Sequence, residues 1–69
     1  MPLVTIHIAK RAKAVTKAQK RQLAEGITDL LEQVLQKRRD SVTVLIQEHD
    51  PDNWAEGGEL VSDLRRRKV

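Results

Sequence analysis

A chain of 69 residues without a cysteine has few routes to a stable fold. A chain this short buries only about 60% of the surface that its unfolded form exposes, so we expect one domain over residues 1–69. Small domains usually gain the missing stability from disulfides, a bound metal or association between copies. The sequence lacks cysteine, and its two histidines, His7 and His49, are far apart in the chain. We therefore expect a homo-oligomer that holds no metal and no cofactor.

The composition also bears on location. No segment has the apolar core of a signal peptide, and no apolar run approaches the roughly 20 residues of a membrane helix. The absence of cysteine fits an intracellular protein. We expect a cytoplasmic protein that does not contact a membrane.

The basic residues are grouped. Thirteen Lys and Arg against ten Asp and Glu give a net charge of +3, with clusters at residues 10–13, 37–39 and 65–68. Such clusters either bind anions or only keep a surface solvated. Trp54 is the one aromatic residue, and a single ring cannot form a stacking platform for nucleic acid. Small carboxylates are the favoured anionic partner, and nucleic acid is not expected.

Hydrophobic periodicity predicts an α+β fold built on one βαβ unit. Residues 3–8 and 41–47 alternate between two faces and are rich in β-branched side chains, which predicts two strands. The apolar residues between these strands recur at spacings of three and four, which predicts one long helix. Strands joined through a helix are expected to be parallel, with the helix covering one face of the sheet.

The sequence predicts where the helix begins and ends. Thr16 followed by Gln19 fits a capping box, so we predict a helix over about residues 16–37. Residues 37–39 are basic and would complement the macrodipole in the last turn.

The C-terminal segment predicts turns. Asp-Pro at residues 50–51 and Gly-Gly at 57–58 indicate a loop, a short turn around Trp54 and a small hairpin or edge strand, followed by a tail at 65–69 that we expect to fray. Asp50 and Asp52 are better explained by a turn than by a metal site.

One βαβ layer leaves the far face of its sheet uncovered. Leu3, Leu45 and Trp54 have no partner for this face within the chain, and two strands do not make an independently stable sheet. Association of subunits would supply the cover. His7 lies on the same face of the first strand as Leu3, and we expect a structural or interface role for it.

Pro2 carries the most distinctive chemistry. Removal of Met1 would leave a secondary amine that is fixed by its own ring. An ordinary α-amine has a pKa of about 7.7–8.0, and a general base works best near the operating pH. A prolyl amine is intrinsically more basic, so cationic neighbours and an apolar pocket would have to lower its pKa.

The segments at residues 2–8, 16–20, 41–48 and 54–60 resemble the 4-oxalocrotonate (2-hydroxymuconate) tautomerase family in order and spacing. The most specific parts are the proline at position two, the Ile-His-Ile strand and the aromatic-x-x-Gly-Gly-Glu segment. The resemblance implies a hexamer, a trimer of dimers, whose active sites are built from neighbouring subunits. It implies that the amine of Pro2 takes a proton from a dienol acid and returns it to carbon.

The resemblance also implies two arginines that bind substrate carboxylates and an aromatic wall. Trp54 matches the wall, where a phenylalanine is usual. The first arginine position holds Ala12, with Arg11 adjacent, and the second holds Thr43, which cannot clamp a carboxylate. Arg38 and Arg39, just before the second strand, can supply a cation from another backbone position. The expected substrate is a small carboxylate or dicarboxylate.

Other functions stay open at this point. The same amine could add water to an unsaturated or halogenated acid, as a hydratase or dehalogenase does. Alternatively, the fold could persist as an oligomeric binding module whose activity is impaired by the change at Thr43.

Overall fold

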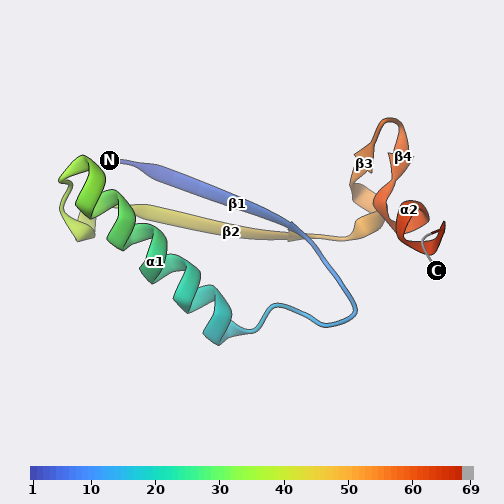
Figure 1. The fold of residues 1–69 in the computed structure, drawn as a ribbon, viewed down its shortest axis with the longest axis horizontal. Helices are drawn as coiled ribbons and strands as arrows, with labels where there is room; N and C mark the ends of the chain where they lie inside the picture. Colours follow the sequence, from blue (N-terminus) through green and yellow to red (C-terminus); the bar gives the residue numbers. More distant parts are fainter. Residues whose placement is uncertain (68–69) are drawn as a thin grey trace.

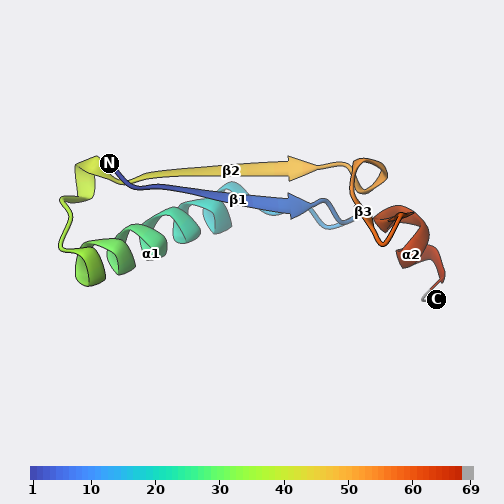
Figure 2. The ribbon, with the colours of Figure 1, turned by 90° about the horizontal axis from the view of Figure 1, so that it is seen from above.

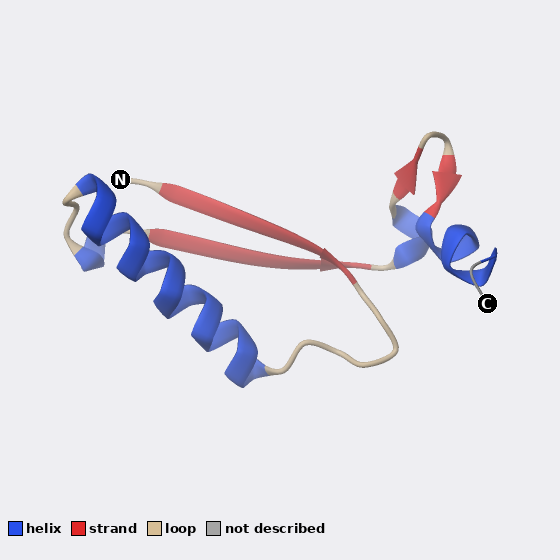
Figure 3. Cartoon of the chain, in the orientation of Figure 1, coloured by secondary structure: helices blue, strands red, loops and turns tan. Residues whose placement is uncertain are grey.

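A computed structural model describes residues 1–67 of the chain. Figure 1 shows the long strands running alongside the helix, with a small C-terminal unit at the end away from the amino terminus. Figure 3 shows the long loop that joins the first strand to the helix. The elements in chain order are β1 (Leu3–Ala9), α1 (Lys17–Leu35), the 3-10 turn η1 (Arg39–Ser41), β2 (Thr43–His49), the 3-10 turn η2 (Pro51–Asn53), β3 (Ala55–Glu56), β4 (Glu59–Leu60) and α2 (Val61–Arg67).

The sheet of β1 and β2 confirms the predicted parallel pairing. Leu3 lies opposite Thr43 and Ala9 lies opposite His49, so the two strands are in register over their full length. Backbone hydrogen bonds extend the ladder at both ends, from Thr43 N to Pro2 O at 3.0 Å and from Lys10 N to His49 O at 2.8 Å. Pro2 has no N–H to donate, and its position at the start of a strand leaves no ladder bond unmade.

Helix α1 covers one face of this sheet and leaves the other open (Figure 2). Val4, Ile6 and Ile8 of β1 are partly buried, whereas Leu3, Thr5 and His7 between them are exposed. The period of two in the sequence therefore separates a helix-covered face from an open face, as predicted. Across residues 1–67, no helix is long and apolar enough to cross a membrane.

The predicted start of α1 is confirmed and its predicted end is wrong. The Thr16 side chain accepts a hydrogen bond from Gln19 N, and the Gln19 side chain accepts one from Thr16 N, which completes the capping box. The helix stops at Leu35 because Gln36 takes a left-handed conformation, with φ 54°. Residues 37–39 therefore lie beyond the last turn.

The second strand begins later than predicted. Ser41 N and Ser41 Oγ both donate to Arg38 O, and this local bonding folds Arg39–Ser41 into a 3-10 turn. β2 consequently runs over Thr43–His49 rather than over residues 41–47. Serine favours such local bonds over a strand ladder.

The C-terminal segment contains the predicted hairpin and an additional helix. Gly57 and Gly58 have φ of 59° and 84°, the conformation that a tight two-residue hairpin turn requires. Residues 65–67, which we expected to fray, belong to α2. An ion pair between Arg67 and Glu59 and the burial of Val61 hold this helix against the hairpin. Residues 68–69 of the predicted tail lie outside the described part of the chain.

The single chain has almost no core. Val61 is the only buried apolar residue among those described. The chain exposes 5665 Å², compared with about 4,400 Å² expected for a folded monomer of 7.9 kDa. Its radius of gyration is 15.4 Å, and a compact chain of this length would have about 11 Å. The excess surface includes Leu3 and Leu45 on the open face, which is the surface that the expected association of copies would cover.

We expect Leu45→Glu to prevent assembly and, with it, folding. Leu45 is 47% exposed on the open face, and an unpaired carboxylate buried there by another subunit would be strongly destabilising. Size-exclusion chromatography with light scattering and circular dichroism would measure both effects. Gln22→Glu adds the same charge at an exposed position of α1 and serves as the control. A folded monomer of the Leu45 variant would contradict the dependence of folding on assembly.

An ion pair fastens α1 to the sheet. Lys20 of α1 bonds to Glu48 of β2, whose side chain is only 18% exposed. The hydrogen bond from Lys20 lowers the pKa of Glu48 below its ordinary value, partial burial opposes this shift, and the charge of Lys10 adds to it. The folded state therefore binds this proton less readily than the unfolded state does. The resulting stabilisation is complete above the ordinary pKa of glutamate and is lost as the pH falls through the lowered value.

Lys20→Gln should accordingly lower the thermal midpoint more at about pH 7 than at about pH 3, because pH 3 is below the ordinary glutamate value and part of the stabilisation has been lost there. Unfolding followed by circular dichroism at the two pH values measures the difference. Lys17→Gln removes the same charge at an exposed position three residues away and should shift the two midpoints equally. A Lys20 variant that was equally destabilised at both pH values would refute the assignment.

Candidate active site

Pro2 stands at the amino end of the sheet. Its carbonyl is fixed by Thr43 N, and its ring is partly buried, whereas Met1 before it is 94% exposed. Thr43 also lies opposite Leu3 in the register. The structure thus places Thr43, which occupies the expected position of the second arginine, directly beside Pro2.

Two predicted cations lie near this end, and both have partners. Arg39 Nη1 donates to carboxylates of Asp29 and Glu32 on α1. These bonds, that to Asp29 first, raise the pKa of Arg39 and tie η1 to the helix. Arg38 pairs with Asp40 at 3.0 Å, and its side chain remains 86% exposed. Arg38 is therefore the more available of the two for an anion.

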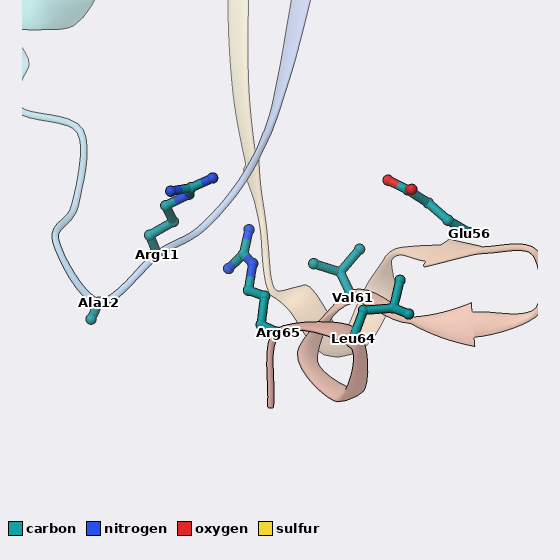
Figure 4. A pocket seen from close by; sticks show the side chains of 6 residues that line it. All are labelled: Arg11, Ala12, Glu56, Val61, Leu64 and Arg65. Carbon is teal, nitrogen blue, oxygen red and sulfur yellow. The ribbon is translucent and has the colours of Figure 1, made fainter. Parts of the chain in front are cut away.

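Arg11 lies at the opposite end, where a hollow of about 570 Å³ opens between the loop after β1 and the C-terminal unit. Figure 4 shows Arg11 on the loop and Arg65 on α2, with Glu56 reaching in from β3. Val61 and Leu64 form an apolar side of the hollow. Two guanidinium groups beside an apolar wall are suited to a small organic anion.

The position of Arg65 beside Arg11 is not predicted by the sequence analysis, which expects residues 65–69 to form a frayed tail. The Arg65 guanidinium donates to Lys10 O and, at 3.4 Å, to Ala9 O, so it fixes the backbone from which the Arg11 loop departs. The available signal was the apolar spacing of Leu60, Val61 and Leu64 just before it, which is helical.

Trp54 lies at this end as well, beside two histidines. A second hollow of about 210 Å³ is lined by His7, His49, Asn53 and Trp54. The Asp50 carboxylate accepts a hydrogen bond from Asp52 N at 2.9 Å and caps η2, which confirms the predicted turn just before the tryptophan. Among residues 1–67, no group of three or more His, Asp and Glu side chains could hold a metal ion.

The structure does not bring the predicted residues together within one chain. β1 has seven residues, which separates Pro2 from Arg11 and Trp54 by roughly 20 Å. The sheet face between the two ends is open. A site that uses all of these residues must combine the amino end of the sheet in one chain with the carboxyl end of the sheet in another chain.

Comparison with known proteins agrees with this fold. The sequence matches the Tautomerase family, described as tautomerase enzyme, over residues 2–64. This chain belongs to the Tautomerase family. It has the βαβ fold with a C-terminal hairpin, and its membership supports an isomerase activity of the tautomerase kind.

Individual relatives cover nearly the whole chain. A Helicobacter pylori protein named "Probable tautomerase" is 40% identical over 97% of this chain and 98% of its own length. The crystal structure of DmpI from Helicobacter pylori is 40% identical, covers 94% of this chain and 97% of that one, and has a TM-score of 0.87. A heterohexamer 4-oxalocrotonate tautomerase from Chloroflexus aurantiacus is 26% identical, with coverages of 94% and 100% and a TM-score of 0.79.

We expect Arg65→Ala to weaken the binding of a small dicarboxylate by about tenfold or more, because the loop that carries Arg11 loses the charged hydrogen bonds that fix it. Calorimetric titration of the assembled protein would measure the affinity. Arg65→Lys should restore it only in part, because an ammonium cannot reproduce the fork that spans two carbonyls. Arg66→Ala removes the same charge from the next, exposed residue. If both alanine variants lost affinity equally, net charge rather than the position of Arg65 would be responsible.

Proposed function

We propose that this protein is a cofactor-independent tautomerase that converts small 2-hydroxy-dienoate (enol) acids to 2-oxo acids, with the amine of Pro2 as the general base. The observation that carries the proposal is the setting of Pro2. The family match begins at this residue, and its carbonyl, not its nitrogen, is used to anchor it to β2. Once Met1 is removed, the lone pair of a secondary amine is left at the end of a fixed strand.

The reaction needs one group that takes and returns a proton. The Pro2 nitrogen accepts the proton of the 2-hydroxyl group, and the O–H electron pair forms the C2 carbonyl. The double bonds shift along the chain, and carbon takes its proton back from the prolyl ammonium. The amine ends as it began, so no cofactor is consumed.

Cations would assist at two points. Binding of the substrate carboxylates orients the dienol, and positive charge near Pro2 lowers the pKa of its amine so that it is unprotonated near neutral pH. We assign these roles to Arg11, with Arg65 beside it, at the carboxyl end of the sheet of a neighbouring chain. Arg38 is the cation supplied by the same chain, since the donors of Arg39 are bound to Asp29 and Glu32.

The same neighbour would supply the wall. Trp54 and Arg11 both lie at the carboxyl end of the sheet, so one neighbouring chain would contribute an apolar surface and a cation together. The open sheet face and the relative described as a heterohexamer support a hexamer for this chain, built as a trimer of dimers. Each assembly would hold one site for each Pro2.

Pro2→Ala should lower kcat/KM by about a hundredfold or more, the range for loss of a general base. Ketonisation of 2-hydroxymuconate or phenylenolpyruvate, followed by ultraviolet absorbance, provides the assay. Pro51→Ala changes the only other proline, at the start of η2, and should be far less affected. Full activity in an assembled Pro2→Ala protein would eliminate this mechanism. An assembled wild-type protein that turned over no enol would indicate a binding module instead.

Met1 provides a second control on the same residue. While Met1 is attached, the Pro2 nitrogen is a tertiary amide and cannot accept a proton. Protein shown by intact mass to retain Met1 should be inactive, and treatment with a methionine aminopeptidase should activate it. Met1 is exposed and therefore open to such treatment.

A further inference from the structure

Among residues 1–67, Glu56 is the one acidic side chain that lines the larger hollow. Figure 4 shows its carboxylate on the side of the hollow away from Arg11, and the apolar side chains of Val61 and Leu64 lie between the two sides. The proposed mechanism does not use this carboxylate. A ligand that fills the hollow of about 570 Å³ therefore meets two guanidinium groups on one side and one carboxylate on the other.

The hairpin gives no local reason for a carboxylate at this position. Glu56 of β3 lies directly opposite Glu59 of β4, and like charges at directly opposite positions of an antiparallel pair are destabilising. The Arg67 side chain pairs with Glu59. Among the described residues, the Glu56 carboxylate belongs to no ion pair, so its charge is available to a ligand in the hollow.

The two cations of the hollow differ in what they can offer a ligand. The Arg65 guanidinium donates to Lys10 O and Ala9 O, so part of its donors are occupied and it contributes mainly positive charge. Within residues 1–67, Arg11 belongs to no ion pair, and its side chain is exposed. Its planar fork can therefore bind one carboxylate of a ligand through two parallel hydrogen bonds.

Glu56 restricts what the other end of that ligand can carry. An ionised carboxylate only accepts hydrogen bonds, so it bonds well to a hydroxyl or an ammonium group. A second carboxylate on the ligand would have no hydrogen to donate and would be repelled by the charge of Glu56. The hollow therefore favours an acid that has one carboxylate and a hydrogen-bond donor at its far end.

We propose that Glu56 is a specificity-determining residue that selects monocarboxylic acids with a polar donor at the far end over dicarboxylic acids. The assignment of this preference to catalysis rests on the proposed function, in which Arg11 binds a substrate carboxylate. The preference in binding does not. Of the two substrate classes that the sequence favours, a small carboxylate and a dicarboxylate, Glu56 selects the first.

Two saturated acids of equal length test the preference without any reaction. The acids 6-hydroxyhexanoate and hexanedioate carry the same carboxylate at one end and differ only at the other. Calorimetric titration of the assembled wild-type protein should give tighter binding for the hydroxy acid. Glu56→Gln removes the charge and keeps the shape of the side chain. It should strengthen the binding of hexanedioate by about two- to fivefold, the range for an exposed charge pair, and should weaken that of the hydroxy acid.

Asp63→Asn provides the matched control. It removes the same charge from an exposed position of α2 that does not line the hollow. The ratio of the two dissociation constants should stay at the wild-type value in this variant. An equal change of the ratio in both variants would overturn the inference, because net charge rather than the position of Glu56 would then set the preference.

The kinetic arm compares two enol acids. The acid 2-hydroxy-2,4-pentadienoate has one carboxylate, and 2-hydroxymuconate has a second carboxylate at its far end. Glu56→Gln should raise kcat/KM for 2-hydroxymuconate, relative to the monoacid, by a similar factor of about two to five. An unchanged ratio of the two kcat/KM values would overturn the assignment of Glu56 to the site that turns over enols.

The binding outcomes are separable from the proposed function. Tighter binding of hexanedioate than of the hydroxy acid by the wild-type protein, or no measurable binding of either acid, overturns the inference without reference to activity. A change of preference confined to Glu56→Gln supports it, even if Pro2→Ala were to retain full activity and the proposed function were wrong.

Discussion

The parallel ladder between β1 and β2 is the interaction on which the other features of the chain depend. It places Pro2 beside Thr43 at one end and His7 near His49 at the other, because the two strands are in register over their full length. It also creates the difficulty that the fold must solve. Two parallel strands have two faces, and one amphipathic helix can cover only one of them. The other face, with Leu3 and Leu45, is therefore left open in the single chain, and it is the surface that the expected association of copies would cover.

Much of the fold was predictable because its signals are local. The alternation of side chains between two faces predicted both strands, the Thr16–Gln19 pair predicted the start of the helix, and Gly57–Gly58 predicted the hairpin turn. The errors occur where a distant or conformational effect decides. A left-handed Gln36 ends α1 although basic residues follow it, and no local preference of glutamine indicates this. Helix α2 depends on contacts with the hairpin and with the end of β1, which a seven-residue sequence does not reveal.

The candidate site also contains some residues that follow from the sequence and others that depend on tertiary contacts. Pro2 and Trp54 were predicted from the resemblance, because their positions match its motif, and their roles stay predictions. The sequence does not indicate which arginine is available to a substrate, because that depends on which side chains already bind each guanidinium group. Arg38 and Arg39 are adjacent in the sequence, yet one guanidinium is bound to two carboxylates of α1 and the other is mostly exposed. Arg65 gains its place beside Arg11 only through the tertiary fold.

The distance along β1 has an evolutionary consequence. If the base acts from one end of a subunit and the cation and aromatic wall act from the other end of its neighbour, the two halves of the site are separable traits of one gene. After a duplication, one copy could lose Pro2 and the other Arg11, and a mixed assembly in which every interface pairs unlike chains would still keep half of its sites complete. A relative described as a heterohexamer shows that this fold can assemble from unlike chains. A symmetric assembly of this kind can therefore divide its catalytic labour without changing its fold.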